Sequence, residues 1–269
     1  MTDILKDYDP IALSEMGGIR LMNRTDTKYV TTEQKLRLLL RQARDQYYVQ
    51  DIDGRRMAEY YTLYFDTEGC DMFRAHHNGK LNRQKLRIRS YADSDLNFLE
   101  VKTKNNHRRT KKKRIALERF DCHNPSYDDV AGVCSGESVG WNDFLSANLG
   151  YDTAHISAKV ENHFCRITLV NKGKTERLTI DTGLRFVNVN DGTERNLGGL
   201  VIIELKRDGL VPSPIEEMLL NLRIKPMGFS KYCMGMAMTY NNIRKNRFMP
   251  RLTKIGKLLA VEREALMAM

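Results

Sequence analysis

The chain has 269 residues, of which 41% are hydrophobic and 29% are charged, so the composition excludes global disorder and predicts a packed core. Lysine and arginine total 44 against 34 aspartate and glutamate, and the resulting net charge of +10 favours a polyanionic partner. The N-terminus does not resemble a signal peptide, no apolar run approaches the ~18 residues of a membrane helix, and the five scattered cysteines form no CxxC pair. We therefore expect a cytoplasmic protein without a transmembrane segment.

The first half of the chain combines strand and helix patterns. In chain order we expect an amphipathic lead-in at 1–22, a strand at 23–30, a helix at 33–43, a strand at 59–66, a short helix at 68–75, and strands at 83–91, 97–104 and 110–117. Thr31 and Thr32 offer an N-cap for the first of these helices. His76 and His77 stand at no metal-ligand spacing from a cysteine, and we expect them at the surface.

The amino-acid composition changes at 121–157, where the strand patterns stop. Pro125, several glycines and Trp141 indicate a helical insertion here, with a helix at 139–149. Strands are then expected at 159–170, 176–181, 184–189 and 199–206, and helices at 212–222, 231–247 and within 248–269. The C-terminal helices thus occupy about 212–269. We expect the last helix to pack on the sheet, with docking to a membrane surface or a partner as the alternative. The pattern predicts a single α+β domain spanning 1–269.

Charged residues recur on one face of the predicted strands, because side chains alternate between the two faces of a strand. These positions are Arg24, Asp26 and Lys28; Lys85, Arg87 and Arg89; Glu100, Lys102 and Lys104; Lys112 and Arg114; Arg166; Arg177 and Asp181; and Glu204 and Lys206. The solvated face of an open sheet would explain any one strand. Like charges on neighbouring strands repel, however, so the recurrence favours a closed antiparallel barrel with the charges inside. Such a lining suits a phosphate chain with a divalent cation.

The ordered motifs resemble a known family. RTDTKY, YFDT, KLRIRSY, FLEVKTK, KKKR, FCRITLV, RLTID, VIIELK and FSKY together look like the triphosphate tunnel metalloenzymes (the CYTH-like superfamily), and within them the VTC domain, the polyphosphate polymerase branch. The resemblance extends over residues 20–240. It implies a closed antiparallel β-barrel that binds a triphosphate or polyphosphate along its axis, with helices outside and at the C-terminus.

The resemblance also implies roles for individual residues. The matching phosphate-binding, catalytic positions are Lys28, Arg87, Arg89, Lys102, Lys112, Arg166, Arg177 and Lys231, and the substrate contacts are Ser230, Phe164, Arg114, Lys104 and Lys206. The run KKKR leaves the register of Lys112 uncertain by one residue. Phe164 stands where the family often has a tyrosine, which removes one hydrogen bond to phosphate. Glu204 and Glu100 are the implied ligands of Mn²⁺ or Mg²⁺.

One departure separates the branches of this superfamily. The hydrolytic tunnel enzymes begin with ExExK, whose glutamates help to bind metal, whereas this chain has Arg24 at the first position and Asp26 at the second. Arg24 disfavours a two-metal hydrolase, although Asp26 remains available as a ligand. The resemblance thus implies a phosphotransferase that moves the γ-phosphate of ATP to the end of an inorganic polyphosphate chain and releases ADP.

Two other functions remain open. The first is a triphosphatase of the same fold that hydrolyses inorganic or organic triphosphate. The second is a non-catalytic polyanion- or RNA-binding protein. The basic run at 107–114 supports this alternative. We find no RNP motif, KH loop or zinc finger and expect no specific nucleic-acid partner. The expected partners are ATP and polyphosphate, with a membrane protein as a further possibility.

Overall fold

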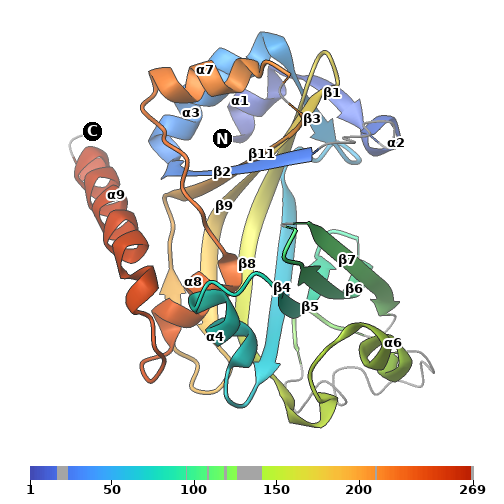
Figure 1. Ribbon diagram of the computed structural model, residues 1–269. Coiled ribbons are helices and arrows are strands. Elements are labelled where there is room, and N and C mark those ends of the chain that lie inside the picture. Colours follow the sequence, from blue (N-terminus) through green and yellow to red (C-terminus); the bar gives the residue numbers. More distant parts are fainter. Residues whose placement is uncertain are drawn as a thin grey trace.

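The computed structural model describes residues 1–16, 24–94, 96–107, 109–117, 120–125, 141–209 and 211–267. Its centre is one curved antiparallel sheet (Figure 1). In spatial order the sheet contains β2 (Arg24–Thr32), β11 (Leu200–Asp208), β9 (Glu176–Asn188), β8 (Ile156–Asn171), β4 (Ala58–Thr67), β5 (Arg83–Tyr91), β6 (Leu96–Lys104) and β7 (Thr110–Leu117). The expected α+β class is confirmed.

Three short strands that the sequence patterns did not predict extend this sheet. β1 (Asp9–Ala12) pairs in parallel with β3 (Tyr47–Asp51), β3 pairs with the end of β8, and β10 (Glu194–Asn196) pairs with β9. Conversely, β9 is one strand where two were expected. Gly183 adopts a φ of +62° and the ladder shifts on the partner strand β8, so the sequence DTG forms an irregularity within a strand and not a turn.

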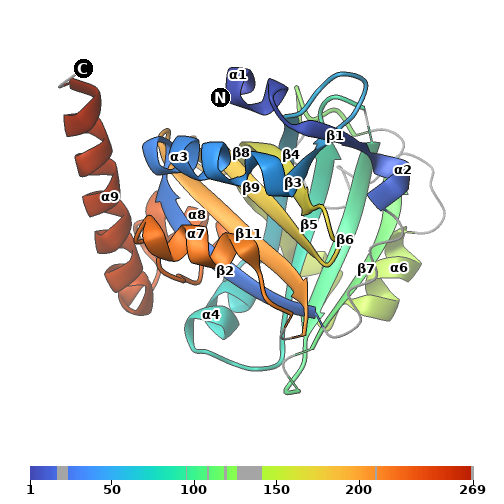
Figure 2. The same ribbon diagram turned by 90° about the horizontal axis from the view of Figure 1, so that it is seen from above.

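Helices cover the outer, apolar face of the β2–β11–β9–β8 half of the sheet (Figure 2). They are α1 (Thr2–Lys6), α3 (Glu33–Ala43) and α7 (Pro214–Asn221). Leu36, Leu39 and Leu40 of α3 are fully buried against β-strand residues such as Ile203 and Leu178, as their helical spacing predicted. Burial of this face turns the charged face of the same strands inward.

A second group of helices lies at the other end of the sheet. It comprises α4 (Asp71–His77), α6 (Trp141–Asn148) and α8 (Lys231–Thr239). The helix α9 (Met249–Met267) starts at this end and runs along β2 to α3, where Glu262 accepts a hydrogen bond from the Gln34 amide, and α2 (Leu13–Met16) lies apart beside β1. The helix expected at 231–247 ends at Thr239, because Tyr240 adopts an extended conformation. Of the insertion expected at 121–157, residues 126–140 lie outside the described part of the chain, so the predicted start of its helix at 139 does too. None of the described helices combines the length and the apolar character that spanning a membrane requires.

The expected closure of the barrel is wrong for the described residues, since the ladder of paired strands ends at β2 on one side and β7 on the other. The outer edge of β2 is not available for pairing with β7, because another segment of the chain covers it. Tyr29 forms a bridge with Pro226, and the Met227 amide donates a 2.8 Å hydrogen bond to the Lys28 carbonyl. The segment that leads into α8 therefore takes the place that β7 would need in a closed barrel.

The histidine pair also departs from expectation. His77 is buried, and its Nε2 lies 2.9 Å from Asn246 Oδ1 in the 3₁₀ turn Asn246–Phe248. His76 is partly buried, and its ring lies 6.1 Å from that of Phe248. Both histidines therefore belong to the contact between α4 and the segment before α9, and not to the open surface.

Candidate functional site

The predicted cations gather on the inner face of the sheet, where strand register places them in rows. Across β5, β6 and β7, Lys85 lies opposite Lys102, which lies opposite Lys112. One step along the strands, the second row runs through Arg87, Glu100 and Arg114. Three adjacent lysines in one row repel one another, so this wall is arranged to receive an anion.

Glu100 neutralises part of the second row. Its carboxylate is 1% exposed and accepts hydrogen bonds from Arg87 Nε at 2.8 Å and from Lys112 Nζ at 3.0 Å. Burial alone would raise the pKa of Glu100, but the charges of Arg87, Arg89 and Lys112 lower it to about 2. Both oxygens are thus engaged by cations. This geometry makes Glu100 a counterion and does not favour its predicted role as a metal ligand.

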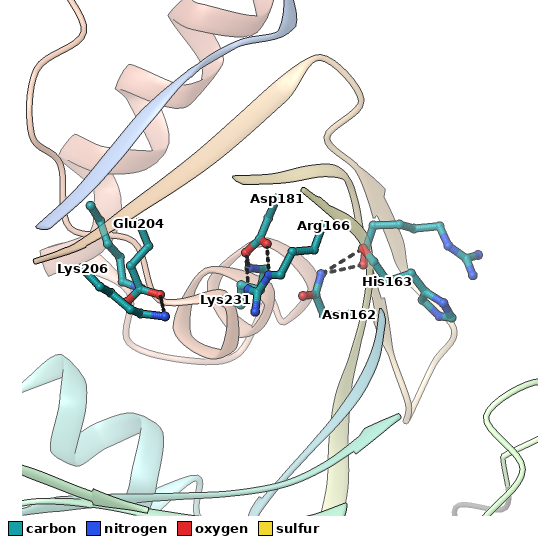
Figure 3. Close-up of polar contacts among 9 residues, drawn as sticks. Asn162, His163, Arg166, Asp181, Glu204, Lys206 and Lys231 are labelled. Carbon is teal, nitrogen blue, oxygen red and sulfur yellow. Dashed lines mark hydrogen bonds and ion pairs between the residues drawn. The ribbon is translucent and has the colours of Figure 1, made fainter. Parts of the chain in front are cut away.

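A second carboxylate, which the sequence patterns placed on the charged face but not in the site, organises the middle of the sheet. Asp181 of β9 accepts hydrogen bonds from Arg166 Nε at 2.6 Å and Arg166 Nη2 at 2.9 Å, and it also pairs with Lys231 of α8 (Figure 3). Lys231 Nζ lies 4.1 Å from the centre of the Phe164 ring, a cation–π contact that holds the ammonium group over the aromatic face.

The third carboxylate is Glu204 of β11. Its oxygens lie 2.9 Å from Lys28 Nζ and 3.2 Å from Lys206 Nζ, and these charges hold the pKa of Glu204 well below its usual range although burial opposes them. Asp26 lies opposite Lys206 in the β2–β11 ladder, on the same face. Figure 3 shows Glu204 and Lys206 beside the Asp181 cluster, facing the same interior space.

The N-terminus of α8 brings Ser230 and Lys231 into this face. Ser230 Oγ caps the helix by accepting from the Cys233 amide, and it also accepts a 2.7 Å hydrogen bond from Lys85. Gly235 lets the helix approach the sheet, because a Cβ there would lie 2.7 Å from a ring carbon of Phe186. Tyr232 donates to the fully buried Asp66, which also accepts from two amides at the start of α4.

Asp66 and Tyr232 are therefore positioning residues that the sequence patterns did not identify. The motifs YFDT and FSKY contain them, but only the tertiary contact shows that the two motifs meet. Lys85 was similarly recognised as a charged-face residue and not as part of the site. The sequence did contain a signal for it, because Lys85 alternates in step with Arg87 and Arg89 and therefore lies on the same face of the strand.

The two walls face each other across the interior. Desolvation between the two walls and the charges of Lys85, Arg87 and Lys28 lower the pKa of Lys102 on β6 to about 8, while Glu204 on β11 acts in the opposite direction. Strands at opposite ends of the ladder thus lie within electrostatic range. The remaining predicted residues, Arg89, Lys104, Arg114 and Arg177, occupy the same face by strand register. The structure therefore brings the predicted cations together.

Two lysines of this face have pKa values close to neutral pH. Burial, together with neighbouring cations, lowers the pKa of Lys231 to about 7 and that of Lys85 to about 8. Folding therefore releases protons from these lysines at pH values between these pKa values and the usual value for lysine. The unliganded fold gains stability as pH rises through this window, whereas anion binding favours the protonated lysines.

We expect opposite pH trends for stability and for affinity. Between about pH 7 and pH 10, the window from these lowered pKa values to the usual value for lysine, the contribution of these lysines raises the melting temperature of the free protein, and the affinity for tripolyphosphate falls. Thermal melts and binding titrations across this range check both trends. An affinity that is constant or rises with pH would show that neither lysine binds the anion in its charged form.

Comparison with known proteins supports a family assignment. The family described as the VTC domain matches residues 23–240. No curated protein matches the chain. Among solved structures, a Bacillus halodurans protein provisionally assigned as an adenylate cyclase is similar, with 14% identity, a TM-score of 0.48, and coverage of 78% of this chain and 96% of that chain. A Hippeastrum protein is also similar, with 15% identity, a TM-score of 0.48, and coverage of 82% of this chain and 98% of that chain. That protein is likewise provisionally assigned as an adenylyl cyclase and is described as having a dominant triphosphatase activity.

Proposed function

The chain belongs to the VTC domain family, and on that premise we propose that it is a polyphosphate polymerase that transfers the γ-phosphate of ATP to an inorganic polyphosphate chain. One observation carries the proposal: an inner face on which lysines and arginines from β2, β5, β6, β7, β8, β9, β11 and α8 converge, with only a few carboxylates among them. Such a face holds extended polyanions by charge and by hydrogen bonds.

The transfer needs little covalent chemistry from the protein. A terminal phosphate oxygen of the polyphosphate chain attacks the γ-phosphorus of ATP, a new P–O bond forms, and the bond to the β-phosphate oxygen breaks, so that ADP leaves with that electron pair. The attacking oxygen is already anionic, so no strong general base is required. Because charge spreads over the equatorial oxygens during transfer, positioning and charge neutralisation dominate catalysis.

The residues of the inner face would share these tasks. Arg87 and Arg166 are oriented by their carboxylate partners Glu100 and Asp181, so their guanidinium groups are fixed before substrate arrives. Lys231 and Ser230, presented by the first turn of α8, would contact the phosphates between the two walls. The lysine row Lys85, Lys102 and Lys112 would hold phosphates that do not react.

A divalent cation fits Glu204 best. Within the described part of the chain no three acidic, histidine or cysteine side chains gather to hold a metal by themselves. Mg²⁺ is commonly held by one or two carboxylates together with substrate phosphates, and Glu204, with Asp26 nearby in the ladder, can supply that share. The bound metal would neutralise charge on the transferred group. Lys28 and Lys206 pair with Glu204 and keep it ionised, but its side chain is 18% exposed against 1% for Glu100, so a metal ion with its phosphates would reach it.

Hydrolysis of a triphosphate is the second candidate, since the same cations would bind that substrate. The pairing of Glu100 and Asp181 with two cations each speaks against it, because neither carboxylate is available to activate water. Capture of RNA without turnover draws support only from the exposed strand β7, where Lys111 and Lys113 project from the opposite side to Lys112.

Product analysis tests the proposal directly. The purified protein is incubated with ATP and Mn²⁺ or Mg²⁺, with and without a short polyphosphate primer, and the products are resolved by gel electrophoresis and nucleotide chromatography. We expect ADP together with a ladder of phosphate polymers. ADP with orthophosphate alone would establish the triphosphatase, and the absence of ATP consumption with primer present would leave a binding protein.

A further inference from the structure

A second group of cations lies where β5 begins, β6 ends and α9 starts. We call it the α4–α9 cluster, and it consists of the cations Arg83, Lys104 and Arg251 together with the neutral His76. The cluster draws on a part of the chain beyond residues 23–240, to which the family match is confined, because Arg251 belongs to α9. Figure 1 shows α4, α8 and the first turns of α9 at the same end of the sheet.

The segment before α9 is firmly attached to α4. Phe248 is 3% exposed, and its ring centre lies 5.6 Å from those of both Phe73 and His77. This anchor sets the path of the first turn of α9. Arg251, three residues later, reaches back toward the segment that precedes α8, since a Cβ placed on Gly228 would lie 4.0 Å from Arg251 Nη2.

The sheet supplies the other two cations. Arg83 of β5 lies opposite Lys104 of β6, one step along the strands from the opposed pair Lys85 and Lys102. Residues two positions apart on a strand are separated by about 6.8 Å, so the cluster continues the lysine row outward. Lys85 links the two regions, because it donates to Ser230 at the start of α8.

His76 shows that these charges converge. Its pKa is lowered to about 2 by burial and by the charges of Lys85, Arg83, Arg251 and Lys104, and no acidic group is among the main influences on it. Its Nδ1 is buried without a hydrogen-bond partner in the described structure. Cations from β5, β6 and α9 therefore act together on one neutral imidazole that has an unused polar atom.

We propose that the α4–α9 cluster binds internal phosphates of the polyphosphate chain that lie beyond the reacting end. The inference rests on the proposed function for the identity of the polyanion, and on the geometry for its location. An ATP molecule whose phosphates lie between Arg166 and Arg87 would not need these residues. A longer chain that leaves over Lys85 and Lys102 would reach Arg83 and Lys104 next, and then Arg251.

Chain-length dependence of binding tests the inference. The variants Arg83→Ala, Arg251→Ala and their combination are titrated, without ATP or metal, with long-chain polyphosphate and with tripolyphosphate. We expect the double variant to lose affinity for the long chain by about tenfold or more, which corresponds to about 1.4 kcal/mol or more, and to keep its affinity for tripolyphosphate. Lys254→Ala removes one exposed charge from the next turn of α9 and serves as the matched control.

The outcomes separate this inference from the proposed function. Wild-type protein that binds both ligands equally, or variants that bind the long chain normally, would overturn the α4–α9 cluster as a binding site. Equal losses for both ligands would overturn it as well, because the residues would then act on the whole inner face or on the fold. Selective loss for the long chain in a protein that makes no polymer from ATP would uphold the site and refute the polymerase.

Discussion

The variant Arg87→Ala is expected to lose turnover on the order of 10³-fold, as for removal of an arginine that stabilises the charge of a transferred phosphate. The side chain of Arg87 is 17% exposed and faces the interior, and Glu100 fixes the orientation of its guanidinium through two nitrogens. Alanine removes both the charge and the fixed donors. Steady-state rates of ADP formation with ATP, metal and primer measure this loss.

The same substitution is expected to destabilise the fold, because Glu100 is 1% exposed and would keep one ion-pair partner, Lys112, among the residues that the structure describes. Leaving one partner of a buried ion pair without the other typically costs about 3 kcal/mol of unfolding free energy. The double variant Arg87→Ala/Glu100→Gln should recover most of this stability and none of the activity. Denaturant unfolding of both proteins distinguishes the two contributions.

Arg185→Ala is the matched control for this pair, since Arg185 is a half-exposed arginine of β9 that pairs with Glu194 away from the inner face. We expect it to change turnover little, and to change stability by less than about 1 kcal/mol. If Arg87→Ala retained substantial turnover while folded, the phosphates would have to lie elsewhere on the inner face. That result would contradict the site as we describe it.

The variant Glu204→Gln is expected to lose metal-dependent turnover, also on the order of 10³-fold, because Glu204 is the principal carboxylate that we propose for the metal. Binding should move in the opposite direction. Without the Glu204 charge, Lys28 and Lys206 lose their counterion, so metal-free affinity for tripolyphosphate is expected to rise.

The Glu204→Gln variant is thus expected to lower metal-dependent turnover and to raise metal-free anion affinity, and two separate measurements distinguish these effects. ATP turnover against metal concentration reports the first effect, and titration with tripolyphosphate in the presence of a chelator reports the second. The conservative variant Glu204→Asp keeps the charge and should retain part of the metal dependence. Unchanged turnover in Glu204→Gln would place the metal at other residues, and weaker anion binding would mean that Glu204 supports the fold of the face itself.

The strands of the inner face were predictable because alternation is a local property. The expected bounds of β5 and β7 agree with the structure, and the rows of cations follow directly from their parity. Short strands gave no comparable signal. β3 and β10 have three to five residues and obtain their stability from partners on β8 and β9, which no local pattern reveals.

The failure to close the barrel has a similar origin. Alternation identifies which side chains share a face, but it does not say what covers the edge of the first strand. That edge is taken by Pro226 and Met227, which lie about two hundred residues away in sequence from Tyr29. The contact between Asp66 and Tyr232, which positions Lys231, was hidden for the same reason.

The row formed by Lys85, Lys102 and Lys112 also affects how long the protein survives. Three like charges held side by side oppose folding, and a polyanion bound only by the folded chain reverses that balance. Ligand at 100 times its dissociation constant adds about 2.7 kcal/mol to the unfolding free energy. Proteases cleave opened chains, so the half-life of this protein among them should lengthen when phosphate polymers are plentiful and shorten when they are scarce.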